Sequence, residues 1–95
     1  MLLVTTAVTA RSETAEEVAS VLHTLSRASR SDRGCISHAF GVDLGDPNLF
    51  RSIEMWESFD THDAHMRTSH VEAALSELDP MIAGEIRIDV FDVGG

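Results

Sequence analysis

The order of hydrophobic periodicities along the chain is the sequence feature that most constrains the fold. Residues 35–44 alternate between two sets of side chains, and residues 85–93 do the same, which is the pattern of half-buried strands. Residues 2–10 are rich in β-branched types and contain no Gly or Pro, so they predict another strand. A strand is also predicted over residues 49–57. The turn residues 45–48, Gly-Asp-Pro-Asn, predict that it forms an antiparallel hairpin with the strand before it.

The alternation assigns the side chains of the hairpin to opposite faces. In its first strand, one face is predicted to carry Ile36, His38, Phe40, Val42 and Leu44, and the other Cys35, Ser37, Ala39 and Gly41. In its second strand, one face is predicted to carry Phe50, Ser52, Glu54 and Trp56, with Arg51 on the opposite face. Both faces of the predicted sheet therefore carry apolar or aromatic groups.

Helical spacing fills the first gap between these strands. The apolar stripe of this helix is Val18, Val21, Leu22 and Leu25. Thr14 and Glu17 fit a capping box at its start, and Gly34 predicts its end.

The second gap is predicted to hold a helix in two pieces. Ser58 or Asp60 caps the first piece, and a capping box of Ser69 and Glu72 opens the second. The apolar stripe of the second piece is Val71, Ala74, Leu75 and Leu78.

The resulting order, β-α-β-β-α-β, is that of the ferredoxin-like α+β fold. It predicts one domain over residues 1–95, with a four-stranded antiparallel sheet and both helices on a single face. The other face would expose a large apolar patch unless something covers it. We therefore expect a homodimer in which sheet packs on sheet, with Arg51 at the dimer contact.

The net charge of −9 excludes several classes of partner. Sixteen acidic residues face seven basic ones, all of them Arg. This balance argues against nucleic-acid binding and against binding to anionic membrane surfaces. The chain has no apolar run long enough to span a bilayer and no signal-peptide pattern. The single Cys35 cannot form an internal disulfide, so a cytoplasmic location is expected.

The densest cluster of polar side chains lies between Glu54 and His70. His62 and His65 are three residues apart and share a helix face. Imidazoles bind transition metals, but the spacing His-x2-His-x4-His is a weak metal signature, and the break near Ser69 is expected to turn His70 away. The sequence therefore predicts no metal. Taken singly, His62 and His70 are read as helix-end or surface residues.

His65 is the strongest candidate for chemistry in this cluster. It is predicted in mid-helix between Ala64 and Met66, where an imidazole can accept a proton near neutral pH. The structural alternative is a core histidine satisfied by Glu54. Trp56, the only Trp, shares the strand face of Glu54 and can line a pocket.

The run Glu54-Met55-Trp56-Glu57-Ser58, followed by residues 64–70 (Ala-His-Met-Arg-Thr-Ser-His), resembles the antibiotic biosynthesis monooxygenase (ABM) family. The stretch from Arg30 to Gly34-Cys35 and the pair Asp46-Pro47 support this resemblance, which spans almost the whole chain. The resemblance implies a dimeric α/β barrel. It also implies a small oxygenase that needs no cofactor and oxidises quinols or polyketide-like aromatics with O₂.

The resemblance also assigns roles to individual residues. The expected catalytic group is His65, Trp56 and Glu54, and the expected substrate contacts are His62, Met66, Phe40 and His38. His62 stands six residues after Trp56, where some polyketide oxidases place a Tyr, so their proton-transfer scheme does not transfer directly.

Three alternatives remain open at this stage. The first is a dimeric ligand-binding or stress-associated protein without oxidation, and the second is an isomerase-type or hydrolytic relative. The third is haem degradation, for which related proteins use an Asn in the first strand and an axial His near position 75. This chain has Thr5-Thr6-Ala7 and Leu75 in those places.

Overall fold

The computed structural model describes residues 1–94 and has the predicted ferredoxin-like order of elements. The elements are β1 (Leu2–Thr9), α1 (Ala15–Ser29), β2 (Cys35–Asp43), β3 (Asp46–Trp56), α2 (Phe59–Met66), α3 (Ser69–Leu78) and β4 (Arg87–Asp92). Two short 3₁₀ helices, η1 (Ser12–Thr14) and η2 (Asp79–Met81), precede α1 and follow α3. The strands pair antiparallel in the order β2-β3-β1-β4, so the predicted sheet is confirmed.

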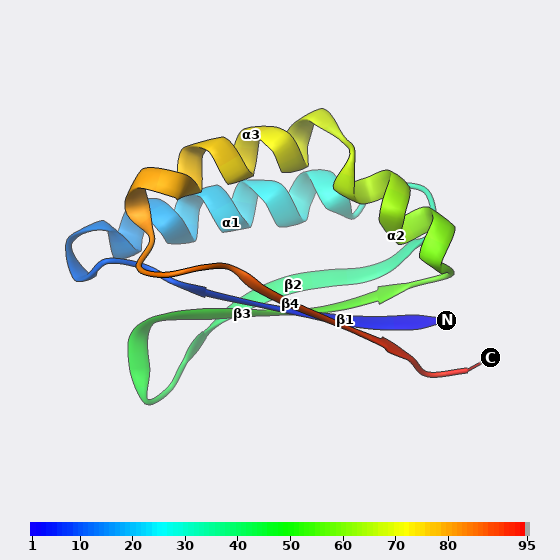
Figure 1. The fold of residues 1–95 in the computed structure, drawn as a ribbon, viewed down its shortest axis with the longest axis horizontal. Coiled ribbons are helices and arrows are strands. Elements are labelled where there is room, and N and C mark those ends of the chain that lie inside the picture. The colour runs from blue at the N-terminus through cyan, green and yellow to red at the C-terminus, as the bar shows by residue number, and fades with distance from the viewer. Residues whose placement is uncertain (95) are drawn as a thin grey trace.

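The helices form a single layer on one face of the sheet (Figure 1). α1 and α3 lie side by side, and α2 covers the end of the sheet where β2 begins and β3 ends. The far end of the β2–β3 hairpin curls away from the helix layer. None of the helices within residues 1–94 is both long and apolar enough to cross a membrane.

The pairing of β2 with β3 contains two irregularities that the alternation did not predict, one between Val42 and Asp43 next to the turn and one at the start of β2. Cys35 pairs with Trp56 but Ser37 pairs with Met55, so Ile36 is the extra residue of a bulge. The bulge puts Cys35 against the cluster formed by Leu2, Val4 and Trp56, on the helix-covered face. The prediction that Cys35 and His38 lie on opposite faces was therefore wrong.

The ends of several elements also differ from the predictions; α1, for example, ends at Ser29 and not at Gly34. β3 begins at Asp46, so the predicted turn is shorter than residues 45–48. The Thr14 side chain caps no backbone N–H of α1; its hydroxyl donates to the carbonyl of Met81 instead. α3 is capped by Thr68, whose hydroxyl accepts the N–H of Val71, not by Ser69. The Thr14 hydroxyl thus bonds to a residue distant in the sequence, and Thr68 caps α3 one position before the predicted Ser69. The spacing of residues in the sequence determines neither contact.

The start of α2 has the predicted cap. The Ser58 hydroxyl accepts the N–H of Thr61, and the Thr61 hydroxyl accepts the N–H of Ser58. This reciprocal pair satisfies two N–H groups that a helix start leaves without partners. It fixes α2 directly after β3, over the end of the sheet that carries Trp56.

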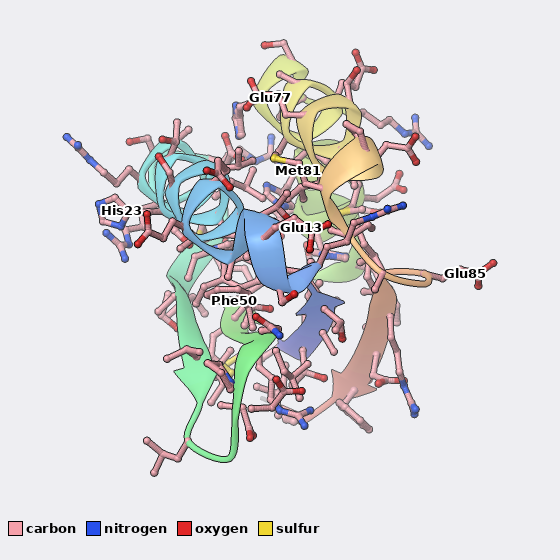
Figure 2. All side chains as sticks on the ribbon, turned by 90° about the vertical axis from the view of Figure 1, so that its left-hand side faces the viewer. Glu13, His23, Phe50, Glu77, Met81 and Glu85 are labelled. Carbon is pink, nitrogen blue, oxygen red and sulfur yellow. The ribbon has the colours of Figure 1, made fainter. Side chains whose placement is uncertain are left out.

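The apolar core lies between the helix layer and the sheet. Its larger cluster is built from Val8, Ala10, Val18, Leu22, Phe50 and Leu78. Figure 2 shows Phe50 between the sheet and α1, while His23 points outward from α1. The opposite, helix-free face is concave and leaves Ile53 64% exposed and Phe91 50% exposed.

Candidate active site

The polar side chains predicted to carry chemistry meet at a cavity between the helices and the sheet. The cavity has a volume of about 50 Å³. Its apolar walls include Leu22, Leu75 and Ile88, and its polar walls are formed by Thr6, His38, Glu54, His62 and His65. Of the seven site residues predicted from the sequence, all but Trp56 line it; the other two are Phe40 and Met66. Trp56 is completely buried behind them.

Glu54 is a buried carboxylate surrounded by donors. It is 3% exposed and lies on the predicted face of β3. The Trp56 indole N–H donates to Oε1 at 3.1 Å, and the hydroxyls of Ser52 and Thr6 donate to Oε2 at 2.7 and 3.3 Å. All three are donors to a group that accepts at both oxygens, which is the arrangement of an ionised carboxylate.

His38 links this carboxylate to α1. Its Nε2 lies 3.4 Å from Oε1 of Glu54, and its Nδ1 lies 2.9 Å from the hydroxyl of Ser26. An ionised Glu54 only accepts, so we assign the ring proton to Nε2, and the Ser26 hydroxyl then donates to Nδ1. Burial lowers the pKa of His38 although Glu54 opposes the shift, so His38 is neutral at pH 7.

His65 has a different carboxylate partner from the one expected. Its Nδ1 lies 2.7 Å from Oδ2 of Asp32, in the loop between α1 and β2. The Nε2 of His70 approaches the same oxygen at 2.8 Å. The alternative in which Glu54 satisfies His65 is therefore wrong, and so is the expectation that the break before α3 turns His70 away.

One carboxylate oxygen of Asp32 is the shared partner of His65 and His70. Burial by itself raises the pKa of Asp32, but the hydrogen bonds and the charges of His65 and His70 hold it below its usual range. An ionised Asp32 fixes a proton on Nδ1 of His65 and leaves Nε2 with a free lone pair. The loop that carries Asp32 is itself held by backbone bonds, from the N–H of Asp32 to Ser29 and from the N–H of Cys35 to Asp32.

Aromatic packing fixes the plane of the His65 ring. The ring is 4% exposed, and its centroid lies 4.4 Å from that of Trp56, with the planes inclined by 36°. His62 meets the same Trp56 ring edge-on at 5.6 Å. His62 is 8% exposed, so its reading as a helix-end or surface residue was wrong. It shares a wall of the cavity with His65, as their spacing predicted.

The chemistry available here is proton transfer next to a fixed negative charge. An imidazole with one nitrogen bound to a carboxylate and the other facing a small, mostly apolar space is the arrangement of a general base. The carboxylate holds the ring in one tautomer and stabilises the imidazolium once the proton has been accepted.

Asp32, Ser26 and Thr6 are among the polar residues of this site that the sequence did not predict. Asp32 lies between basic residues in a polar loop, where a solvated carboxylate is the ordinary expectation. Ser26 lies on α1 one position from the apolar residue Leu25 that was assigned to the core stripe, and it is 2% exposed. A buried Ser on the core face of a helix is a usable sign of a polar partner beneath it.

A second, larger hollow of about 910 Å³ lies on the helix-free face. It is an open groove whose lining includes Ala7, Ala39, Arg51, Ile53 and Asp89, and none of the five His residues lines it. The chemistry-bearing residues therefore point to the smaller, interior cavity as the candidate active site.

The buried histidines predict a loss of stability in mild acid. Burial lowers the pKa of His38 and His62 from the ordinary value of 6.5, so below that pH the unfolded chain binds protons that the folded chain does not. The free energy of unfolding should therefore fall as the pH decreases from about 7 to 5. The lowered pKa of Asp32 adds a further loss only below its ordinary value of 3.8.

Denaturant titrations across this pH range check the prediction. His62→Gln should flatten the dependence, because one buried group no longer titrates. His23→Gln is the control, since His23 is exposed on α1, and it should leave the dependence unchanged. Equal slopes in the wild type and in His62→Gln would contradict the assignment.

Comparisons with known proteins agree with the sequence resemblance. The model of the antibiotic biosynthesis monooxygenase family matches residues 1–77. An uncharacterized protein of Synechocystis is 27% identical over 78 residues; the match covers 82% of this chain and 53% of the relative. The chain thus spans about half the length of that curated relative.

Solved structures show the same fold. A putative antibiotic biosynthesis monooxygenase from Deinococcus radiodurans superposes with a TM-score of 0.94 at 22% identity, covering 100% of this chain and 94% of the other. A protein from Pseudomonas aeruginosa gives a TM-score of 0.88 at 26% identity, covering 95% and 90% of the two chains. Because the family model matches residues 1–77, which is most of the chain, this chain belongs to the antibiotic biosynthesis monooxygenase family.

Proposed function

We propose that this protein is a cofactor-independent monooxygenase that oxidises a small, electron-rich aromatic compound with O₂. The observation that carries the proposal is the Asp32–His65 pair at the wall of an interior cavity. Family membership supports the class of reaction. The substrate class is an aromatic with an acidic hydrogen, either a quinol or an anthrone-type ketone.

The reaction begins when Nε2 of His65 accepts a proton from the substrate. Asp32 stabilises the imidazolium, and the apolar walls keep water from the substrate anion. The anion is electron-rich enough to reduce O₂. For an anthrone-type substrate, the ring CH₂ becomes C=O. One oxygen atom of O₂ forms the new carbonyl, and the other leaves as water with the two hydrogens, so the substrate supplies all four electrons.

The size of the cavity determines how a substrate enters. About 50 Å³ has room for water but not for an aromatic ring, and ligand pockets usually measure about 300–1,000 Å³. Leu75 and Ile88 line the cavity and are 43% and 40% exposed, so they form its mouth. A ring enters when these two side chains and Met66 rotate aside. Met66 suits this role because its unbranched side chain repacks readily.

Oxygen consumption tests the proposed reaction. The wild-type protein should consume O₂ in the presence of a quinol or an anthrone, and isotopically labelled O₂ should place one labelled atom in the anthrone product. His23→Ala should behave like the wild type, because His23 is remote from the cavity. Oxygen uptake no faster than with heat-inactivated protein, for both substrate classes, would refute the proposal.

The small cavity favours a second candidate function, the binding of a small ligand without oxidation. Within residues 1–94 every fully buried polar side-chain atom has a hydrogen-bond partner, as expected of a structural polar core. On this reading, an aromatic probe should bind to the wild type and protect it against thermal unfolding while O₂ uptake stays at background. Incorporation of labelled oxygen into a product would exclude this second candidate function.

We also propose that the protein is a cytoplasmic homodimer in which the helix-free faces of two sheets pack together. Leu3 pairs with Met55 on one side and Phe91 on the other, which makes an apolar row across three strands. Ile53, exposed to 64%, lies on the same face. Burying such a face is the usual reason that an open sheet of this kind associates.

Sedimentation of a charged variant tests the dimer. Ile53→Asp should convert the dimer to a monomer at micromolar concentration, because it would bury an unpaired carboxylate in the interface. Phe59→Asp is the control. Phe59 is 60% exposed but lies at the start of α2 in the helix layer, so this variant should remain a dimer. A wild-type monomer under these conditions would contradict the proposal.

A further inference from the structure

Asp32, His65 and His70 bring three metal-ligating atoms together at one point of the fold. One ligand atom from each residue lies within 4.8 Å of the other two. The residues come from the loop before β2, from α2 and from α3. This group differs from the pattern His-x2-His-x4-His in the sequence, because it contains Asp32 in place of His62.

The geometry of these atoms is close to what a divalent metal needs. Nδ1 of His65 and Nε2 of His70 point at the same carboxylate oxygen, at 2.7 and 2.8 Å. Ligand atoms bound to zinc at about 2.0–2.2 Å lie roughly 3.3 Å apart in a tetrahedral site, so only a small separation of the three side chains is required. Two imidazoles and one carboxylate leave a fourth position open to water.

The surroundings of the group fit a site that binds metal reversibly. The side chains of Asp32 and His70 are 16% and 27% exposed, so an ion has a path to the ligands from solvent. Trp56 stacks on the His65 ring and fixes its direction.

We propose that Asp32, His65 and His70 form a binding site for a divalent transition-metal ion, with Zn²⁺ as the representative ion. Two imidazoles and a carboxylate are a typical ligand set for first-row metals, and Ca²⁺ or Mg²⁺ would prefer more oxygen ligands.

Metal binding has a direct consequence for His65. A metal on Nδ1 displaces the proton that Asp32 holds there, and a neutral ring then carries its proton on Nε2. This nitrogen is the one assigned to accept the substrate proton, so the bound ion inhibits the base. This consequence rests on the proposed function, whereas metal binding itself does not.

Calorimetric titration of the untagged, metal-free protein with Zn²⁺ tests the site. We expect saturable binding of one ion per chain. His70→Ala and Asp32→Asn should each weaken Zn²⁺ binding by at least about tenfold. Replacing a residue that only hydrogen-bonds to a metal ligand already lowers metal affinity by about this factor. His23→Ala removes an exposed histidine and should leave the affinity unchanged. The absence of one-per-chain binding, or equal weakening by His23→Ala, would overturn the proposal.

Histidine nitrogen NMR of the wild type gives a second readout that needs no variant. Zn²⁺ should move the Nδ1 signal of His65 and the Nε2 signal of His70 and leave those of His23 in place. Unchanged His65 and His70 signals at saturating Zn²⁺ would overturn the site. If the protein oxidises an aromatic substrate, Zn²⁺ should inhibit the wild type and His70→Ala should relieve the inhibition. Binding without any activity would leave the site intact and refute the proposed function alone.

Discussion

Replacing His65 with Ala is expected to lower kcat/KM for O₂-dependent oxidation by about 10²- to 10⁴-fold, the usual contribution of a general base. His65 is the imidazole whose Nδ1 is held by Asp32 and whose ring is fixed against Trp56. The other histidines at the cavity lack this arrangement. The two ring nitrogens of His38 lie 2.9 Å from Ser26 and 3.4 Å from Glu54, and His62 has no carboxylate within ion-pair distance among residues 1–94. The loss should therefore be specific to His65.

Three measurements separate a lost base from a damaged structure. Added imidazole should restore part of the activity of His65→Ala, because a soluble base can occupy the space of the deleted ring. The melting temperature should be compared for the wild type and for His65→Ala. His62→Ala controls for the loss of a buried histidine from the same helix face; because His62 lines the cavity, its effect on activity should fall on KM and not on kcat. Activity in His65→Ala equal to that of the wild type would rule out His65 as the base.

Asp32 is expected to act as a positioning residue for the same step. Asp32→Asn keeps the size of the side chain but can leave the Nδ1–H of His65 without a carboxylate, so the ring loses its preferred tautomer. We expect kcat to fall by about 10- to 1,000-fold with KM nearly unchanged, because Asp32 does not line the cavity. A rise in KM with an unchanged kcat would instead show that Asp32 serves substrate binding.

The sequence predicted the parts of this molecule that depend on local periodicity. The β-α-β-β-α-β order and the shared face of Glu54 and Trp56 follow from alternation within single segments, and both agree with the structure. The bulge at Ile36 has no such signature, because an extra residue in β2 is defined only by its pairing with β3. It was therefore missed, and with it the position of Cys35.

The partner of His65 was missed for a related reason. Asp32 and His65 are 33 positions apart, and the loop after α1 reads as a polar turn. Glu54 was the natural candidate because it lies on the face of β3 that α2 covers. In the structure, Trp56, Ser52 and Thr6 donate hydrogen bonds to Glu54, and His38 lies 3.4 Å from it. Only the packing of the three elements decides which carboxylate each histidine receives.

Gly34→Ala is expected to produce the largest loss of stability among single substitutions outside the apolar core. Gly34 has a φ of +81°, a conformation that costs a residue with a Cβ about 1–2 kcal/mol. An added Cβ would also lie 2.6 Å from the Thr61 hydroxyl and closer still to its Cβ and Cγ2. Overpacking of this kind costs about 1–3 kcal/mol, so the free energy of unfolding should fall by about 2–5 kcal/mol.

Thr61 cannot move aside to relieve this contact. It is 5% exposed, and its hydroxyl and N–H form the capping box with Ser58 at the start of α2. The carbonyl of Gly34 also accepts the N–H of Glu57, the residue after β3. Any accommodation of an Ala at position 34 must therefore shift α2 relative to the loop that carries Asp32. The distance between Asp32 and His65 should increase, and activity should fall together with stability.

Two other glycines separate the backbone effect from the steric one. Gly84 has a φ of +77° and open space around its would-be Cβ, so Gly84→Ala should lose only the backbone contribution of about 1–2 kcal/mol. Gly41 has neither a positive φ nor a near neighbour, so Gly41→Ala should be close to neutral. Denaturant unfolding of the three variants measures both contributions. If Gly34→Ala were no less stable than Gly84→Ala, the close packing of Gly34 on Thr61 would not determine the position of α2, and the site would owe its geometry to other contacts.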